Sequence, residues 1–167
     1  MVDRRRAIPA LVALLAVAAV LAWRLGAPSP EAQVEARLRA LCDAVGKAPG
    51  ETAVQAAARA LSIASCFANP IEIAGEAGPF AGRHTPRELA AAIARFRAAS
   101  GALDLSFTDL TVEIRPPEEA TARFTARLRG GADGPDDAYR EVSARLRRAE
   151  GLWLFSRFDI VRVMEKP

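Results

Sequence analysis

The sequence offers few side chains suited to catalysis, and its single histidine is the first to consider. His84 follows Arg83 and directly precedes the expected start of a helix, so as a general base it would need a pocket and an orienting partner. A histidine exposed in a loop is the simpler interpretation. Asp109 lies where an alternating strand changes face, and a bulge there would aim its carboxylate inward, whereas a solvent-facing acid is the alternative. His84 and Asp109 are therefore the candidate catalytic residues.

Metal and cofactor chemistry have little support in the residue types. Cys42 and Cys66 are the only cysteines, and they fall near the ends of two successive expected helices. Such positions in a helical hairpin lie further apart than the ~7 Å that a disulfide allows between Cα atoms, which favours two buried thiols. Two cysteines and a distant His84 are too few ligands for a metal, and the glycines at 75, 78 and 82 lack the spacing of a phosphate loop. We expect no metal and no cofactor.

Hydrophobic periodicity predicts the elements that would position these side chains. Apolar residues at steps of three and four predict helices over 31–45, 51–67 and 85–99, the last starting with the capping sequence Thr-Pro-Arg-Glu. Period-two alternation predicts a short strand at 71–73 and long antiparallel strands between 103 and 164. This order of elements indicates the α+β class.

Two of the long strands are expected to bend. The alternation of apolar residues takes a three-residue step at Thr108-Asp109, which flips the strand face. It changes face again between Phe155 and Phe158. A sheet with two such irregularities is strongly curved.

Arginines concentrate on the late strands and share strand parity, which predicts a basic stripe on the sheet face opposite any pocket. A solvated face paired with nearby carboxylates is one interpretation, and a docking surface for anionic headgroups or an acidic partner is the other. The residues proposed for this interaction surface are Arg123, Arg127, Arg145 and Arg147.

Three segments, SCFANPIEI at 65–73, FAGR at 80–83 and EGLWL at 150–154, look like a known family's strand entry, loop-to-helix step and closing hairpin. They resemble the nuclear transport factor 2-like superfamily, which includes SnoaL-like polyketide cyclases and ketosteroid isomerases. The resemblance spans residues 31–164. It implies three N-terminal helices and a short strand packed on a strongly curved antiparallel sheet, a cone-shaped α+β barrel around a pocket.

The resemblance also implies which positions would carry chemistry. The isomerase relatives use a tyrosine of the first helix, an aspartate closing the first strand and an acid of a later strand. Here Leu38 and Leu41, Ala74, and Ser143 with Ala144 occupy the matching stretches. A domain of this fold without that chemistry is therefore expected to bind a small apolar ligand or to act as an interaction module.

The expected ligand-binding residues are aromatic: Phe67, Phe96, Phe107, Phe124, Tyr139 and Trp153. The alternative function is a SnoaL-like lyase, isomerase or hydrolase that acts on a small hydrophobic substrate in the cone, with His84 or Asp109 as the base.

Charge separates the chain into two parts. Of 23 basic and 20 acidic residues, four and one fall in residues 1–27, which leaves 19 of each in the remaining 140. The excess of +3 therefore belongs to the N-terminal segment, and a basic nucleic-acid-binding domain is not expected.

The N-terminal segment has the pattern of a membrane anchor. Residues 1–6 form a basic cytoplasmic tip, residues 7–25 an apolar transmembrane helix or signal anchor, and residues 26–30 a linker. A cleaved signal peptide is the alternative, and both interpretations export the domain. We expect a single-pass protein of the bacterial cytoplasmic membrane with a periplasmic or extracytoplasmic domain, working with an envelope protein or as a homodimer.

Overall fold

The computed structural model describes residues 28–130 and 137–162. The expected basic tip at 1–6 and the expected transmembrane segment at 7–25 lie outside the described residues. Within the described ranges, no helix combines the length and the apolar character that crossing a bilayer requires.

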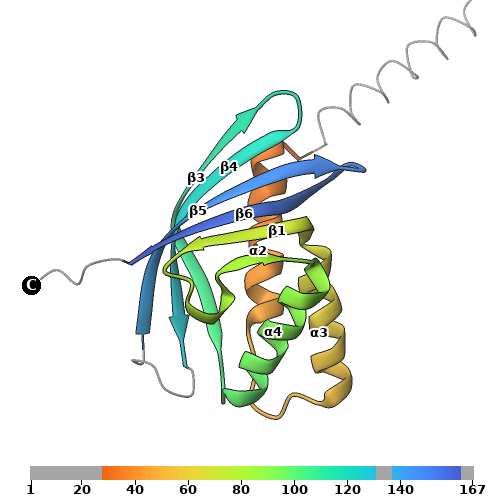
Figure 1. Ribbon diagram of the computed structural model, residues 1–167, viewed down its shortest axis with the longest axis vertical. Coiled ribbons are helices and arrows are strands. Elements are labelled where there is room, and N and C mark those ends of the chain that lie inside the picture. The colour runs from red at the N-terminus through yellow and green to blue at the C-terminus, as the bar shows by residue number, and fades with distance from the viewer. Residues whose placement is uncertain (1–27, 131–136, 163–167) are drawn as a thin grey trace, which may run out of the picture.

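Three helices form one layer of the molecule (Figure 1). They are α2 (Pro30–Val45), α3 (Ala53–Ser65) and α4 (Pro86–Ala99). Each starts at a hydroxyl cap, and the predicted capping box of α4 is present: Thr85 Oγ1 accepts from the Glu88 N–H, and Glu88 accepts from the Thr85 N–H at 2.8 Å. α3 ends at Ser65, two residues before the expected end, because Cys66 caps it and the chain turns into a strand.

The second layer is a six-stranded sheet in the order β2-β1-β6-β5-β4-β3. The strands are β1 (Phe67–Gly75), β2 (Gly82–His84), β3 (Asp104–Arg115), β4 (Glu119–Arg129), β5 (Asp137–Ala149) and β6 (Leu152–Arg162). The α+β class is confirmed. The long strands expected between 103 and 164 pair antiparallel, as predicted, and β1 joins the same sheet parallel to β6 and antiparallel to β2. The expected strand at 71–73 is the centre of β1, and the segment expected as a loop before α4 contains β2 and a 3-10 turn (Gly78–Phe80).

Both expected bends are present. The β3–β4 register shifts between Thr108 and Thr111, where Asp109 has a φ of 56°. The β5–β6 register shifts between Arg145 and Leu146, which pair with Arg157 and Phe155, so Ser156 is the extra residue within the expected stretch. These irregularities increase the local twist, and Figure 1 shows the sheet curving around α2.

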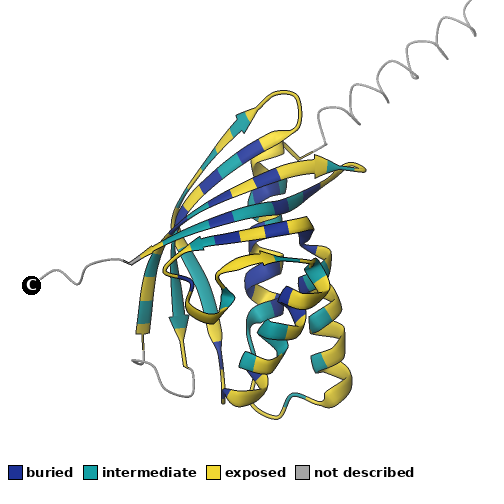
Figure 2. Ribbon diagram, in the orientation of Figure 1, coloured by how far each residue is buried: buried dark blue, intermediate teal, exposed yellow. Residues whose placement is uncertain are grey.

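The core lies between the concave face and α2 (Figure 2). Small side chains at the middle of the sheet, Ala120, Ala122 and Ala144, are at most 2% exposed and let the helix layer approach closely. Leu38 of α2 and Phe155 of β6 fill the space that they leave. The opposite, convex face of the sheet carries the polar residues of the alternating strands.

Candidate functional site

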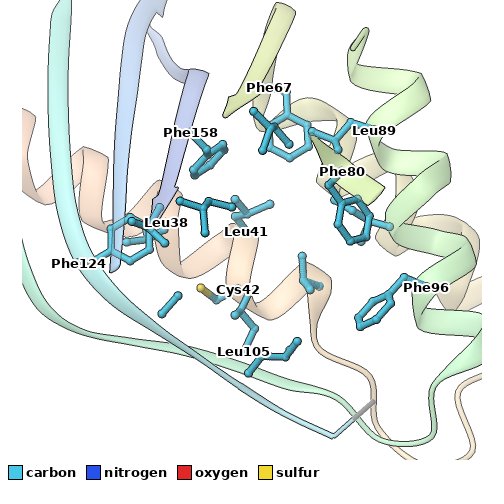
Figure 3. Close-up of a pocket in the computed structure, with 17 residues that line it drawn as sticks. Leu38, Leu41, Cys42, Phe67, Phe80, Leu89, Phe96, Leu105, Phe124 and Phe158 are labelled. Atoms are coloured by element: carbon cyan, nitrogen blue, oxygen red, sulfur yellow. The ribbon is translucent and has the colours of Figure 1, made fainter. Parts of the chain in front are cut away.

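A cavity of about 270 Å³ lies between the concave face of the sheet and the helices α2 and α4 (Figure 3). Phe124 and Phe158 extend into it from the sheet, and Phe80 and Phe96 face them from the helix side. The cavity is lined by Leu38, Leu41, Cys42, Val45, Phe67, Ile73, Phe80, Leu89, Ile93, Phe96, Leu105, Phe124, Ala126, Leu128, Val142, Phe158 and Ile160.

The chemistry of this lining is almost entirely that of hydrocarbon. Among these described residues, no side chain is a carboxylate, an imidazole, a hydroxyl or an amide, and the thiol of Cys42 is the one group that can ionise. Burial, together with the nearby carboxylates of Asp43 and Asp104, raises the pKa of Cys42 to about 12. The thiol is therefore protonated at neutral pH, and the thiolate needed for nucleophilic attack is scarce.

Three of the six aromatic residues expected at the site line the cavity: Phe67, Phe96 and Phe124. Phe107 does not line it. It lies on the same concave face and packs edge-on against the lining residue Phe124, with ring centroids 6.1 Å apart.

Tyr139 and Trp153 also lie away from the cavity lining. Tyr139 pairs with Arg127 across β4 and β5, is 43% exposed, and has the Arg127 guanidinium 5.5 Å from its ring centre. Trp153 is 4% exposed and belongs to the core at the start of β6, where its Nε1–H has no acceptor among the described residues.

The aliphatic residues of the lining are not among the ligand-binding residues predicted from the sequence. Leu38 and Leu41 were recognised as helix residues at the position of the relatives' tyrosine, and their spacing on α2 already indicates one buried face. Phe80 and Phe96 form an edge-to-face pair at 6.0 Å that joins the 3-10 turn to α4. No local pattern links these two rings, since 15 residues separate them.

The two candidate catalytic residues do not line the cavity. His84 lies half-buried on the edge strand β2, and its Nε2 is 3.0 Å from the carbonyl oxygen of Phe80. Asp109 is exposed at the bend of β3 and accepts a hydrogen bond from Thr108 Oγ1 at 3.0 Å. It borders a hollow with Glu141 and Asp159 of the convex face, so of its two expected orientations it takes the solvent-facing one.

The four arginines proposed as an interaction surface do share one face. Cross-strand pairing places Arg123 opposite Ser143, Arg127 opposite Tyr139, Arg145 opposite Thr121 and Arg147 opposite Glu119. All are on the convex face, because the alternating partners Ala122, Phe124, Val142 and Ala144 are the buried ones.

Cys42 and Cys66 are both buried free thiols. Burial also raises the pKa of the Cys66 thiol, which donates to the carbonyl oxygen of Ser62 at 3.4 Å. Within the part of the chain that the structure describes, no group of three or more His, Cys, Asp or Glu side chains converges on a metal position.

No protein-family model matches the sequence, and no curated protein matches it. Solved structures do match. The chain is similar to a candidate scytalone dehydratase from Novosphingobium aromaticivorans, with a TM-score of 0.61 and 12% identity over 79% of this chain and 83% of that one. It is similar to a candidate dehydratase of the NTF2-like family from Streptomyces avermitilis, with a TM-score of 0.61 and 14% identity over 79% and 94%.

A third similar structure is an NTF2-like protein from Cytophaga hutchinsonii, with a TM-score of 0.60 and 11% identity over 81% of this chain and all of that one. At such identities the likeness shows the fold alone. The chain therefore has the nuclear transport factor 2-like fold that its sequence segments resemble.

Proposed function

We propose that this domain binds a small apolar molecule in the cone cavity and does not catalyse a reaction there. The single observation that carries the proposal is the composition of the lining: 17 residues, none with a side chain that exchanges protons near neutral pH. Acid–base catalysis needs a side chain within hydrogen-bond reach of the substrate, whereas binding of a hydrocarbon needs only a dry apolar surface.

The size of the cavity bounds the ligand. An engineered apolar cavity of ~150 Å³ holds benzene, so about 270 Å³ is suited to roughly ten to twelve carbon atoms. Removing roughly 220 Å² of ligand surface from water contributes about 5.5 kcal/mol, which corresponds to a Kd on the order of 100 μM before any contact outside the cavity. A ligand with a buried hydroxyl or keto group would bind more weakly, because the lining side chains cannot pair with it.

Binding of naphthalene, a fluorescent hydrocarbon of about ten carbon atoms, to the full-length chain, and its displacement by decane, tests the proposal. Ala126→Phe places a ring inside the cavity, since Ala126 lines it. The matched control is Ala57→Phe, on the exposed side of α3. We expect Ala126→Phe to weaken probe binding at least tenfold and Ala57→Phe to leave it unchanged. Equal binding by wild type and both variants, with both folded by thermal denaturation, would contradict the proposal.

The second candidate function is a lyase, isomerase or hydrolase of the SnoaL-like kind. The observation that favours it is that two of the similar structures carry dehydratase names. It requires an acid or base to reach the cavity, and His84 and Asp109 are the residues to test. Turnover that disappears in His84→Gln or Asp109→Asn would favour the enzyme, whereas ligand binding that both variants retain would favour the binding domain.

We also propose that residues 7–25 anchor the domain in the bacterial cytoplasmic membrane, with residues 1–6 in the cytoplasm and the domain outside. The supporting observation is the charge distribution: three arginines precede the apolar run, and the domain itself is balanced. Membrane fractionation with immunoblotting tests it, because a shortened soluble species would indicate a cleaved signal peptide instead. Crosslinking in whole cells would then show whether an envelope protein or a second copy binds the domain.

A further inference from the structure

The convex face of the sheet contains a groove of about 540 Å³ that lies apart from the cone cavity. Four neighbouring strands contribute its lining, and the contributing side chains are mostly polar. They are Glu72, Arg115, Glu119, Thr121, Arg123, Ser143, Arg145, Arg147, Ser156 and Arg157, with Ala120 and Leu146 beneath them.

Arg145 is central to this cluster. It lies opposite Arg157 on β6, two residues along β5 from Arg147, and diagonally across from Arg123 on β4. Side chains in these relations are within roughly 5–8 Å of one another at Cβ, and like charges directly opposite each other on a sheet are destabilising. Glu72 and Asp159 offset this repulsion at Arg157, to which both are ion-paired.

Arginines outside the centre of the groove form ion pairs with carboxylates. Arg127 and Arg129 both bind Asp137, at 2.7 and 3.1 Å. Arg157, at the edge of the groove, binds Glu72 at 2.9 Å and Asp159 at 2.7 Å.

The centre of the groove has no such pairing. Within residues 28–130 and 137–162, neither Arg123 nor Arg145 has a carboxylate oxygen within 4.0 Å, and Arg147 donates only to the carbonyl oxygen of Asn69 at 2.9 Å. Three neighbouring guanidinium groups are therefore available to an external anion.

We propose that this groove binds a phosphate-bearing ligand through Arg123, Arg145 and Arg147. A phosphoryl group carries close to two negative charges and several acceptor oxygens, and the planar donor fork of arginine matches those oxygens in pairs. Thr121 and Ser143 add hydroxyl donors to the same lining. A single carboxylate would neutralise only one of the three guanidinium groups, so the phosphoryl dianion fits the charge better.

The position of the groove makes the site independent of the cone cavity. Glu72 and Glu119 line the same groove, so two carboxylates lie among its arginines. An extended polyanion would meet these carboxylates, as well as the balanced charge of the rest of the domain. The geometry therefore favours a compact phosphoryl group, either on a soluble phosphate ester or on a lipid headgroup.

Calorimetric titration of the full-length chain with inorganic pyrophosphate tests the proposal. We expect saturable binding that Arg145→Gln weakens at least tenfold and that weakens further with added salt. The matched control is Arg129→Gln, on the same face but outside the groove and paired with Asp137, which we expect to change the affinity less than twofold. Absence of binding, or equal weakening by both variants, would overturn the proposal.

Two further arms identify the source of the phosphoryl group. Glycerol phosphate represents the soluble ester, and vesicles of phosphatidylglycerol in phosphatidylcholine represent the headgroup, each measured with and without competing pyrophosphate. Competition with pyrophosphate in either arm supports the groove as the binding site and identifies the source of the phosphoryl group. Vesicle binding that neither pyrophosphate nor Arg145→Gln weakens would overturn the proposal. A dimer in solution that Arg145→Gln dissociates would also overturn it, because the groove would then be an interface between copies. Probe binding in the cone cavity is expected to be the same in Arg145→Gln, so failure of one proposal is distinguishable from failure of the other.

Discussion

Replacing Arg97 with methionine is expected to destabilise the packing at the end of the cavity beside the last turn of α4. Arg97 lies at the end of α4, is 2% exposed, and donates to the carbonyl oxygens of Val45 and Gly46, both at 2.9 Å. Its third partner is the Glu51 carboxylate at 2.6 Å, on a side chain that is 9% exposed. The two carbonyl contacts join the end of α4 to the end of α2, and the ion pair joins it to the segment just before α3. Val45 and Phe96, close to Arg97, line the cavity.

The size of the effect follows from these partners. Arg97→Met keeps most of the side-chain volume but leaves a buried carboxylate without its cation and two carbonyl groups without their donor. Breaking a buried pair in this way costs about 3–5 kcal/mol. Glu51→Gln retains an acceptor for the guanidinium, so its cost is about 1–3 kcal/mol. The double variant is expected to be less destabilised than the sum of the two by about 1–3 kcal/mol.

Urea denaturation of wild type, both single variants and the double variant measures this cycle, and Arg95→Met is the control because Arg95 is exposed on the same helix. For a domain of this size, Arg97→Met should lower Tm by about 10–20 °C. It should also weaken naphthalene binding at temperatures where the variant is still folded. A cost below about 1 kcal/mol, or a cost equal to that of Arg95→Met, would refute the reasoning, because the pair would then stabilise no more than a surface contact does.

Three other predictions concern single positions. Trp153→Phe should cost less than about 1 kcal/mol by urea denaturation, because the lost contacts are offset by removal of a buried Nε1–H that has no acceptor among the described residues; a cost above about 3 kcal/mol would contradict this. Gly75→Ala should leave little folded protein by circular dichroism, because φ is +82° and the new Cβ would lie 2.0 Å from the carbonyl oxygen of Ile160; a native Tm would contradict it. The Arg127 guanidinium lowers the pKa of Asp137 below its usual 3.8, so the stabilisation is present above that pH and disappears as pH falls through the lowered pKa. Asp137→Asn should therefore lower Tm at about pH 6 and not at about pH 2, and a difference that persists at the lower pH would exclude this origin.

Local signals in the sequence were enough to predict the helices and strands and to assign several residues to a face of the sheet. The capping box at Thr85 and the alternation along β4 each depend on residues close in the chain, and both predictions are confirmed. The skipped residue at Asp109 located a real bend, since a change of face in a strand requires an irregularity. The same alternation could have placed Tyr139 on the convex face, because it is out of step with Val142 and Ala144.

The cavity itself could be predicted only in part. Periodicity assigns Phe107, Phe124 and Trp153 to the concave face correctly, but it does not say how far along the cone each ring lies. That depth depends on the curl of the sheet and on where α2 and α4 cross it. The parallel pairing of β1 with β6 has the same origin, because it joins segments about 85 residues apart through contacts that no local pattern records.

The sequence alone determined the order of helices and strands, the bends, and the parity that puts Arg123, Arg145 and Arg147 on one face, because these features depend on neighbouring residues and on the fixed periods of backbone geometry. Only the tertiary structure decided that the described residues lining the cavity are apolar apart from the Cys42 thiol, and that these arginines line a groove. Both of those properties depend on which distant residues meet in space, and packing of the whole chain sets that arrangement.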